Sequence, residues 1–168
     1  MTRNKRPLRA LTLLAVLLLA LSAGCSKPGE RYVLQSRQAA EADGHRYTFT
    51  LDLDEAGSTY ETFIAARLNT ARFAEPSLEL QLSLTSPTGQ TAIERIAFPL
   101  RDAGDQLHSS RHGGSVRDFL WPWRDRIRIG EAELGRWTLV ITLPDATLWS
   151  AVEGIGLSYH TTTWEKAN

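Results

Sequence analysis

The strongest constraint on the fold of this chain is a strict alternation of leucine and polar residues at 78–85. Leucine occupies positions 78, 80, 82 and 84, and Glu79, Gln81 and Ser83 lie between them. A strand points successive side chains to opposite faces, whereas a helix would spread the four leucines around its circumference. The segment therefore predicts a half-buried β-strand. Each buried leucine contributes about 1.5–3 kcal/mol, so we expect this strand near the centre of the core.

A hairpin is predicted directly after this strand. Residues 86–89 read Ser-Pro-Thr-Gly, in which the proline fixes φ and the glycine tolerates the return of the chain. Residues 91–98 then form the partner strand, and Pro99 ends it.

Similar short segments recur along the rest of the chain. They lie at 32–34 (the weakest), 45–53, 59–68, 116–121, 126–129, 137–143 and 155–159. We predict a loop or short helical turn at 35–44 and a loop or surface excursion at 101–115. Seven to nine short strands without a convincing long helix indicate an all-β fold. Because several strands are apolar on one face only, we predict an antiparallel β-sandwich of the jelly-roll kind rather than a barrel.

The N-terminal segment has the order of an export signal. Arg3, Lys5, Arg6 and Arg9 precede an unbroken apolar run at 10–20, and small residues follow up to Cys25. This order is typical of a secretory signal, and the run is too short for an ordinary membrane-spanning helix of roughly 20 residues. Leu-Ser-Ala-Gly-Cys at 21–25 resembles the lipobox of bacterial lipoproteins. We therefore expect Cys25 to carry acyl chains such as palmitate, which anchor the protein to a membrane. The alternative is a secretory signal with an incidental cysteine.

This reading divides the chain into three parts. Residues 1–24 form the signal, residues 25–44 hold the lipidated cysteine, a polar tether and a weak first strand, and residues 45–168 form one sandwich domain. Cys25 is the only cysteine, so no disulfide forms within one chain. Loss of the four signal cations leaves the mature chain mildly acidic, which argues against nucleic acid as a partner.

The motifs also resemble a known family, the GldH-type gliding-motility lipoproteins of Bacteroidetes. The similarity rests on the lipobox, the turn at 86–89, and YETFIAARLN at 60–69, IAFPL at 96–100, GRWTL at 135–139 and GIGLSY at 154–159. The chain departs from the family at 106–124, where its tryptophan- and glycine-rich loop is replaced. The resemblance implies an envelope lipoprotein associated with gliding motility and its secretion machinery, without enzymatic activity. With no aspartate after Cys25, lipoprotein sorting favours the outer membrane, with the body facing the periplasm.

No candidate catalytic site emerges from the sequence. His108 and His112 have the spacing of a metal pair on a helix, but the glycines at 113–114 argue against a helix there, so we interpret them as solvated loop residues. Asp52 and Asp54 lie at a predicted strand end and turn and are interpreted as solvated carboxylates. No nucleophile elbow, P-loop or Gly-x-Gly-x-x-Gly motif is present. We expect no cofactor and no bound metal.

Three tryptophans are the candidate contact residues. Trp121, Trp123 and Trp149 fall at predicted strand ends or in loops, with Arg124 beside them. Exposed indoles stack on sugars or anchor a protein partner; the alternative is that they cap the open ends of the core. The sequence thus favours a non-catalytic structural or interaction component of the envelope. A periplasmic or surface glycan-binding module is the alternative, and an enzyme is the third class.

Overall fold

The structure is a computed structural model that describes residues 30–43, 45–101, 109, 114–128 and 130–162. The predicted signal, Cys25 and its tether to residue 29, and both loop histidines, His108 and His112, lie outside the described residues. Within the described part, no helix has the length and apolar character needed to cross a bilayer.

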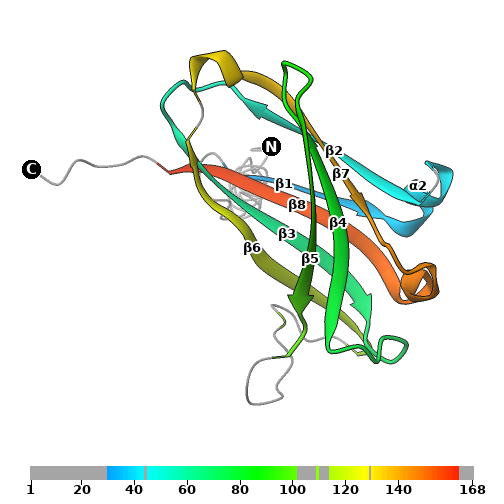
Figure 1. Cartoon of the computed structure of the whole chain (residues 1–168). Coiled ribbons are helices and arrows are strands. Elements are labelled where there is room, and N and C mark those ends of the chain that lie inside the picture. Colours follow the sequence, from blue (N-terminus) through cyan, green and yellow to red (C-terminus); the bar gives the residue numbers. More distant parts are fainter. Residues whose placement is uncertain (1–29, 44, 102–108, 110–113, 129, 163–168) are drawn as a thin grey trace, which may run out of the picture.

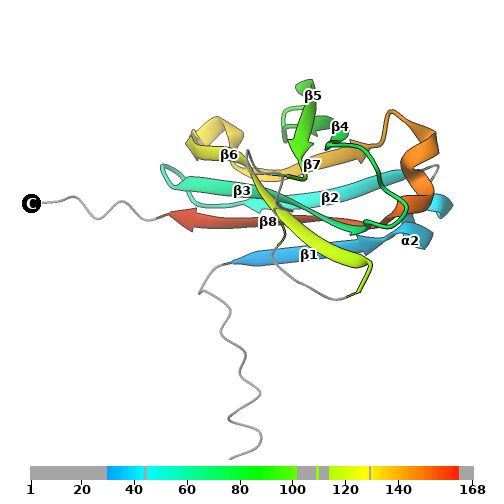
Figure 2. The same cartoon turned by 90° about the horizontal axis from the view of Figure 1, so that it is seen from below.

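The predicted β-sandwich is confirmed. Its strands are β1 (Arg31–Ser36), β2 (Arg46–Leu53), β3 (Thr59–Asn69), β4 (Ser77–Thr85), β5 (Thr91–Pro99), β6 (Val116–Arg128), β7 (Gly135–Thr142) and β8 (Val152–Thr162). They form two antiparallel four-stranded sheets in the orders β1-β8-β3-β6 and β2-β7-β4-β5 (Figure 1). Figure 2 shows the two sheets as layers, one above the other. Two four-stranded sheets connected in this alternating way make a jelly roll.

Three short helices lie between strands. They are α2 (Arg37–Ala42) and the 3₁₀ helices η1 (Glu131–Glu133) and η2 (Ala146–Ala151). We call the end of the sandwich where β1 begins and β8 ends the β1 end. The strand registers place three connections there: the turns at 54–58 and 86–90, and helix η1. Helices α2 and η2 lie at the opposite end, as Figure 1 shows.

The core lies between the sheets and follows the predicted alternation. Leu78, Leu80 and Leu82 of β4 are fully buried, and so is every second residue of β2 from Tyr47 to Leu53. The predicted inward face of β3, which runs from Tyr60 to Leu68, is also buried. β4, the strand with the clearest alternation, therefore contributes to the centre of the core, as predicted.

One strand prediction is wrong. Two segments separated by Trp-Pro-Trp were expected at 116–121 and 126–129, but β6 runs without interruption from Val116 to Arg128. Pro122 is tolerated because β6 is an edge strand that pairs only with β3, and a proline on an edge removes no required ladder bond. The pairing shifts register near Thr62, opposite Arg124, which absorbs the local irregularity.

The weak first strand belongs to the sandwich. β1 pairs along its whole length with β8, from Arg31 opposite Tyr159 to Ser36 opposite Gly154. The described fold thus begins within the segment that the sequence analysis grouped with the tether. Arg31 is six residues after Cys25.

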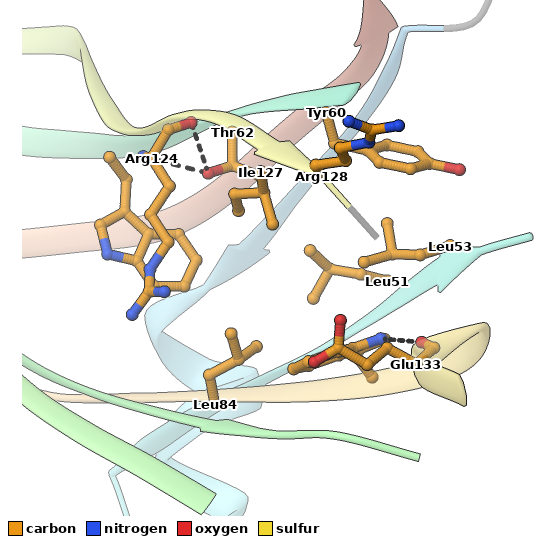
Figure 3. A pocket seen from close by; sticks show the side chains of 11 residues that line it. Leu51, Leu53, Tyr60, Thr62, Leu84, Arg124, Ile127, Arg128 and Glu133 are labelled. Carbon is orange, nitrogen blue, oxygen red and sulfur yellow. Dashed lines mark hydrogen bonds between the residues drawn. The ribbon is translucent and has the colours of Figure 1, made fainter. Parts of the chain in front are cut away.

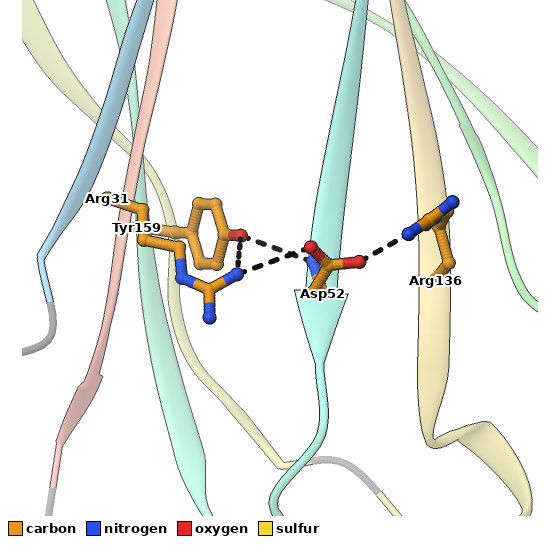
Figure 4. Close-up of polar contacts among 4 residues, drawn as sticks. All are labelled: Arg31, Asp52, Arg136 and Tyr159. Atoms are coloured by element: carbon orange, nitrogen blue, oxygen red, sulfur yellow. Dashed lines mark hydrogen bonds and ion pairs between the residues drawn. The ribbon is translucent and has the colours of Figure 1, made fainter.

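Side chains close one open side of the sandwich, between β1 and β2. The Tyr159 hydroxyl accepts the main-chain N–H of Asp52 at 3.2 Å, and the side chain of Gln35 donates to the Thr48 carbonyl at 2.6 Å. Figure 4 shows Asp52 between the guanidinium groups of Arg31 and Arg136, at 3.3 and 3.2 Å. The bonds from Tyr159 and Gln35 thus occupy main-chain groups of β2, which lies at the edge of its sheet.

Two glycines let β1 approach β8 closely. A Cβ atom at Gly154 would lie 2.7 Å from the carbonyl oxygen of Gln35, and one at Gly156 would lie 2.9 Å from that of Val33. Real Cβ atoms do not tolerate such distances to a backbone oxygen, so β1 keeps its place only opposite glycine.

We therefore expect Gly154→Ala to displace β1 and to lower the free energy of unfolding by about 1–3 kcal/mol. Gly130→Ala is the matched control, because its Cβ would meet only the Glu133 carboxylate at 3.8 Å. The free energy of unfolding of Gly130→Ala should stay within about 0.5 kcal/mol of the wild-type value. Urea denaturation measures both, and equal stability of the two variants would contradict the close approach.

Candidate functional site

A cleft of about 200 Å³ lies between the two sheets toward the β1 end (Figure 3). Its apolar lining consists of Leu51, Leu53, Leu84 and Ile127, together with the rings of Tyr60, Trp123 and Trp137. Thr62, Arg124, Arg128 and Glu133 complete the lining. The cleft combines an apolar interior with charged groups, the usual composition of a small-ligand site.

Strand pairing fixes the walls of the cleft. Tyr60 of β3 lies opposite Ile127 of β6 in the first sheet, and Leu51 of β2 lies opposite Trp137 of β7 in the second. Both pairs point between the sheets because each residue occupies an inward position of its strand. The cleft is thus built from paired strands rather than from loops.

A three-residue cluster joins the two sheets beside the cleft. Glu94 of β5 accepts hydrogen bonds from the Trp123 indole N–H at 2.7 Å and from the Arg124 guanidinium at 3.0 Å. The Arg124 guanidinium also lies over the Trp123 ring, 5.1 Å from its centroid. Both Glu94 and Arg124 are about one-third exposed, so this cluster positions the ring more than it stabilises the fold.

The uncharged polar groups on the side chains of Trp137, Tyr60 and Thr62 are also bonded within the protein. The Trp137 indole N–H donates to the Glu133 carbonyl at 2.8 Å, and the Tyr60 hydroxyl accepts the Glu55 main-chain N–H at 3.2 Å. The buried Thr62 hydroxyl donates to the Arg124 carbonyl and accepts its N–H, at 3.3 and 3.2 Å. Few uncharged hydrogen-bonding groups of the lining are therefore left for a ligand.

The structure separates the three tryptophans predicted as a contact surface. Trp123 and Arg124 line the cleft, as described. Trp149 lies on η2 at the other end, where its N–H donates to Glu41 at 3.1 Å and its ring packs against His45 and Tyr47. The three indoles form no common platform.

The prediction of an exposed contact surface at Trp121 is wrong. Trp121 is only 3% exposed, stacks with Phe98 and Phe119, and donates its N–H to the Pro99 carbonyl at 2.7 Å. It closes the second open side of the sandwich, between β5 and β6. Burial follows from the alternation along β6, which places Trp121 on the same inward face as Phe119.

Of the residues that line the cleft, sequence reasoning named only Trp123 and Arg124 as site residues, and Trp137, Tyr60 and Arg128 are among those it missed. Trp137 and Tyr60 were assigned to half-buried strands without a site, and Arg128 was not singled out. Two features could have identified Trp137 and Tyr60. Each occupies an inward-facing position of its strand, and each lies within three residues of a strand end, where the core of a sandwich meets solvent. Arg128 gives no comparable signal.

Asp52 and Asp54, the carboxylates considered from the sequence, do not line the cleft. Asp52 is paired with two arginines, and Asp54 lies exposed in the following turn. No group of three or more His, Cys, Asp or Glu side chains in the described residues could hold a metal. Outside the cleft, burial raises the pKa of Tyr47 above its usual range.

Comparisons with known proteins return weak similarities. No protein-family model and no curated protein matches the chain. Among solved structures, AlgX of Pseudomonas aeruginosa aligns at 14% identity and a TM-score of 0.35, over 83% of this chain and 27% of AlgX. A family GH115 4-O-methyl-α-glucuronidase aligns at 14% identity and a TM-score of 0.33, over 70% of this chain and 13% of the glucuronidase.

A third structure, TmCBM61 in complex with β-1,4-galactotriose, aligns at 9% identity and a TM-score of 0.31, over 83% of this chain and 85% of that one. The chain spans about a quarter of AlgX and less of the glucuronidase. Similarities at this level say nothing about what the present chain binds.

The different positions of the tryptophans predict different costs of truncation. Trp121→Ala should lower the free energy of unfolding by about 3–5 kcal/mol, because it empties part of the core and leaves the Pro99 carbonyl unpaired. Trp149→Ala, at a half-buried site, should cost about 1 kcal/mol. Chemical denaturation of both variants provides the measurement, and a Trp121→Ala protein of wild-type stability would show that this indole is not part of the core.

Proposed function

We propose that this chain is a non-catalytic lipoprotein of the bacterial envelope, whose β-sandwich acts as a binding domain held close to a membrane. The observation that carries the proposal is the position of Cys25. It directly follows an export-type signal and precedes β1 by only six residues. Two of the charged side chains beside the cleft, Glu94 and Arg124, hold the Trp123 ring in position, which supports binding rather than catalysis.

The short tether limits how far the sandwich sits from the membrane. Six residues, even fully extended, span at most about 20 Å. A lipid at Cys25 therefore keeps the β1 end, where the chain enters the fold, near the bilayer surface. The cleft belongs to this same end of the sandwich.

Acylation of Cys25 is tested directly by growth with an alkyne analogue of palmitate. The wild-type protein should take up the label and sediment with the membranes, because two or more acyl chains give stable anchoring. Cys25→Ala should lose the label and the membrane association together. Ser26→Ala, with the same change in side-chain size beside the cysteine, is the matched control and should behave as wild type. An unlabelled, freely soluble wild-type protein would overturn the proposal.

The location and partners are proposed from the family resemblance. We place the protein in the outer membrane, facing the periplasm, in contact with envelope proteins of gliding motility and its secretion machinery. Density fractionation and protease access to intact cells test the membrane and the orientation.

A clean deletion tests the biological role. The strain should lose surface spreading or secretion, and Cys25→Ala should reproduce the defect because the domain is no longer held at the envelope. Normal spreading and secretion in both strains would contradict the association with motility. The alternative is a glycan-binding module. Its candidate contact residues would be Trp123 and Arg124 of the cleft, because Trp121 is buried in the core.

A further inference from the structure

The cleft between the sheets has a composition that discriminates between kinds of ligand. Both of its indole N–H groups are bonded within the protein, to Glu94 and to the Glu133 carbonyl. The Thr62 hydroxyl is also satisfied internally. A sugar ring carries hydroxyls around its whole edge, and in such a cleft many of them would lose their water partners without replacement. An apolar chain loses nothing there.

The interior of the cleft offers the surface that an apolar chain needs. Three leucines and an isoleucine line it together with two indoles and a tyrosine ring, and Figure 3 shows Leu51, Leu53, Leu84 and Ile127 around the opening. At about 200 Å³ the cleft is smaller than the roughly 300–1,000 Å³ of sites for drug-sized molecules. It therefore accommodates part of a chain rather than a whole lipid.

The charged groups of the lining favour an anionic end on that chain. Arg128 is exposed and has no ion-pair partner among the described residues, whereas Arg124 is paired with Glu94. Glu133, the acidic side chain of the lining, has a carboxylate oxygen 3.4 Å from the Gly130 N–H. A phosphate or carboxylate next to Arg128 would supply that guanidinium with its missing counter-charge.

We propose that this cleft binds the acyl chain of an anionic membrane lipid, with the charged head group at Arg128. The proposal rests on the proposed function in one respect: a lipid at Cys25 would keep the start of β1, at the same end of the sandwich as the cleft, within about 20 Å of the bilayer, the source of such lipids. The occupancy itself depends only on the cleft.

The test uses a lysophosphatidylglycerol with a diazirine near the end of its single acyl chain. It is added below its critical micelle concentration to the full chain, both as wild type and as Cys25→Ala. After irradiation, the labelled peptides are mapped by mass spectrometry. We expect label on the segments that hold Leu51, Leu84 and Ile127 in both proteins.

Two variants make the result specific. Leu84→Trp fills the cleft and should reduce the label there by at least about tenfold, equivalent to a tenfold weaker binding constant. Arg128→Gln, on the exposed rim where folding is not at risk, should weaken labelling by lysophosphatidylglycerol but not by an uncharged monoacylglycerol. Arg136→Gln is the matched control, since Arg136 lies at the same end but outside the cleft, and should change neither.

Several outcomes would overturn the proposal. They are label spread evenly over the surface, label unchanged in Leu84→Trp or Arg128→Gln, or displacement of the label by a soluble sugar such as cellotriose. Failure of the two proposals is distinguishable. An acylated wild-type protein with an unlabelled cleft refutes lipid binding alone, and an unacylated protein with a labelled cleft refutes the anchor alone.

Discussion

The structure depends on the mutual burial of one face of each sheet. Neither sheet is stable alone, because each has an apolar side, and the two sides share one core. The inward residues of β2, β3 and β4 are almost completely hidden from solvent. The two open sides need other interactions, and side chains supply them: Gln35 and Tyr159 bond to main-chain groups of β2, and Trp121 bonds to the Pro99 carbonyl. The cleft lies where the same core opens toward the β1 end.

The core strands could be predicted because their pattern is local. Period-two alternation at 78–85 or 45–53 needs no knowledge of the rest of the chain. Sheet order has no such local signal. β1 pairs with β8 and β3 also pairs with β8, across most of the length of the chain, and nothing in the sequence of either strand specifies its partner.

The tryptophan error has a single physical cause. The gap between the predicted strands at 116–121 and 126–129, which contains Pro122, places Trp121 and Trp123 at apparent strand ends. An edge strand accepts proline, and once β6 is continuous, positions 119, 121 and 123 share its inward parity. The buried Trp121 and the cleft residue Trp123 then follow from alternation alone. The cleft itself could not be foreseen, because its walls come from both sheets and depend on their packing.

The proposed anchor and the cleft depend on two different kinds of information in the sequence. The proposed anchor depends on a short N-terminal segment, and the cleft arises only from the folded sheets. They meet because β1 begins at the end of the sandwich toward which the cleft lies, six residues after Cys25. With the proposed anchor at Cys25, a binding site in this position would face the membrane surface.

The most direct test is the depth of each end of the sandwich in a bilayer. Spin labels at Glu55, in the turn at the β1 end, and at Ser150, on η2 at the opposite end, can be compared on the full chain reconstituted in phospholipid vesicles. Relaxation by a membrane-bound paramagnetic lipid should be strong at residue 55 and weak at residue 150. Equal relaxation at both sites, or the reverse order, would contradict a sandwich held with its β1 end against the membrane.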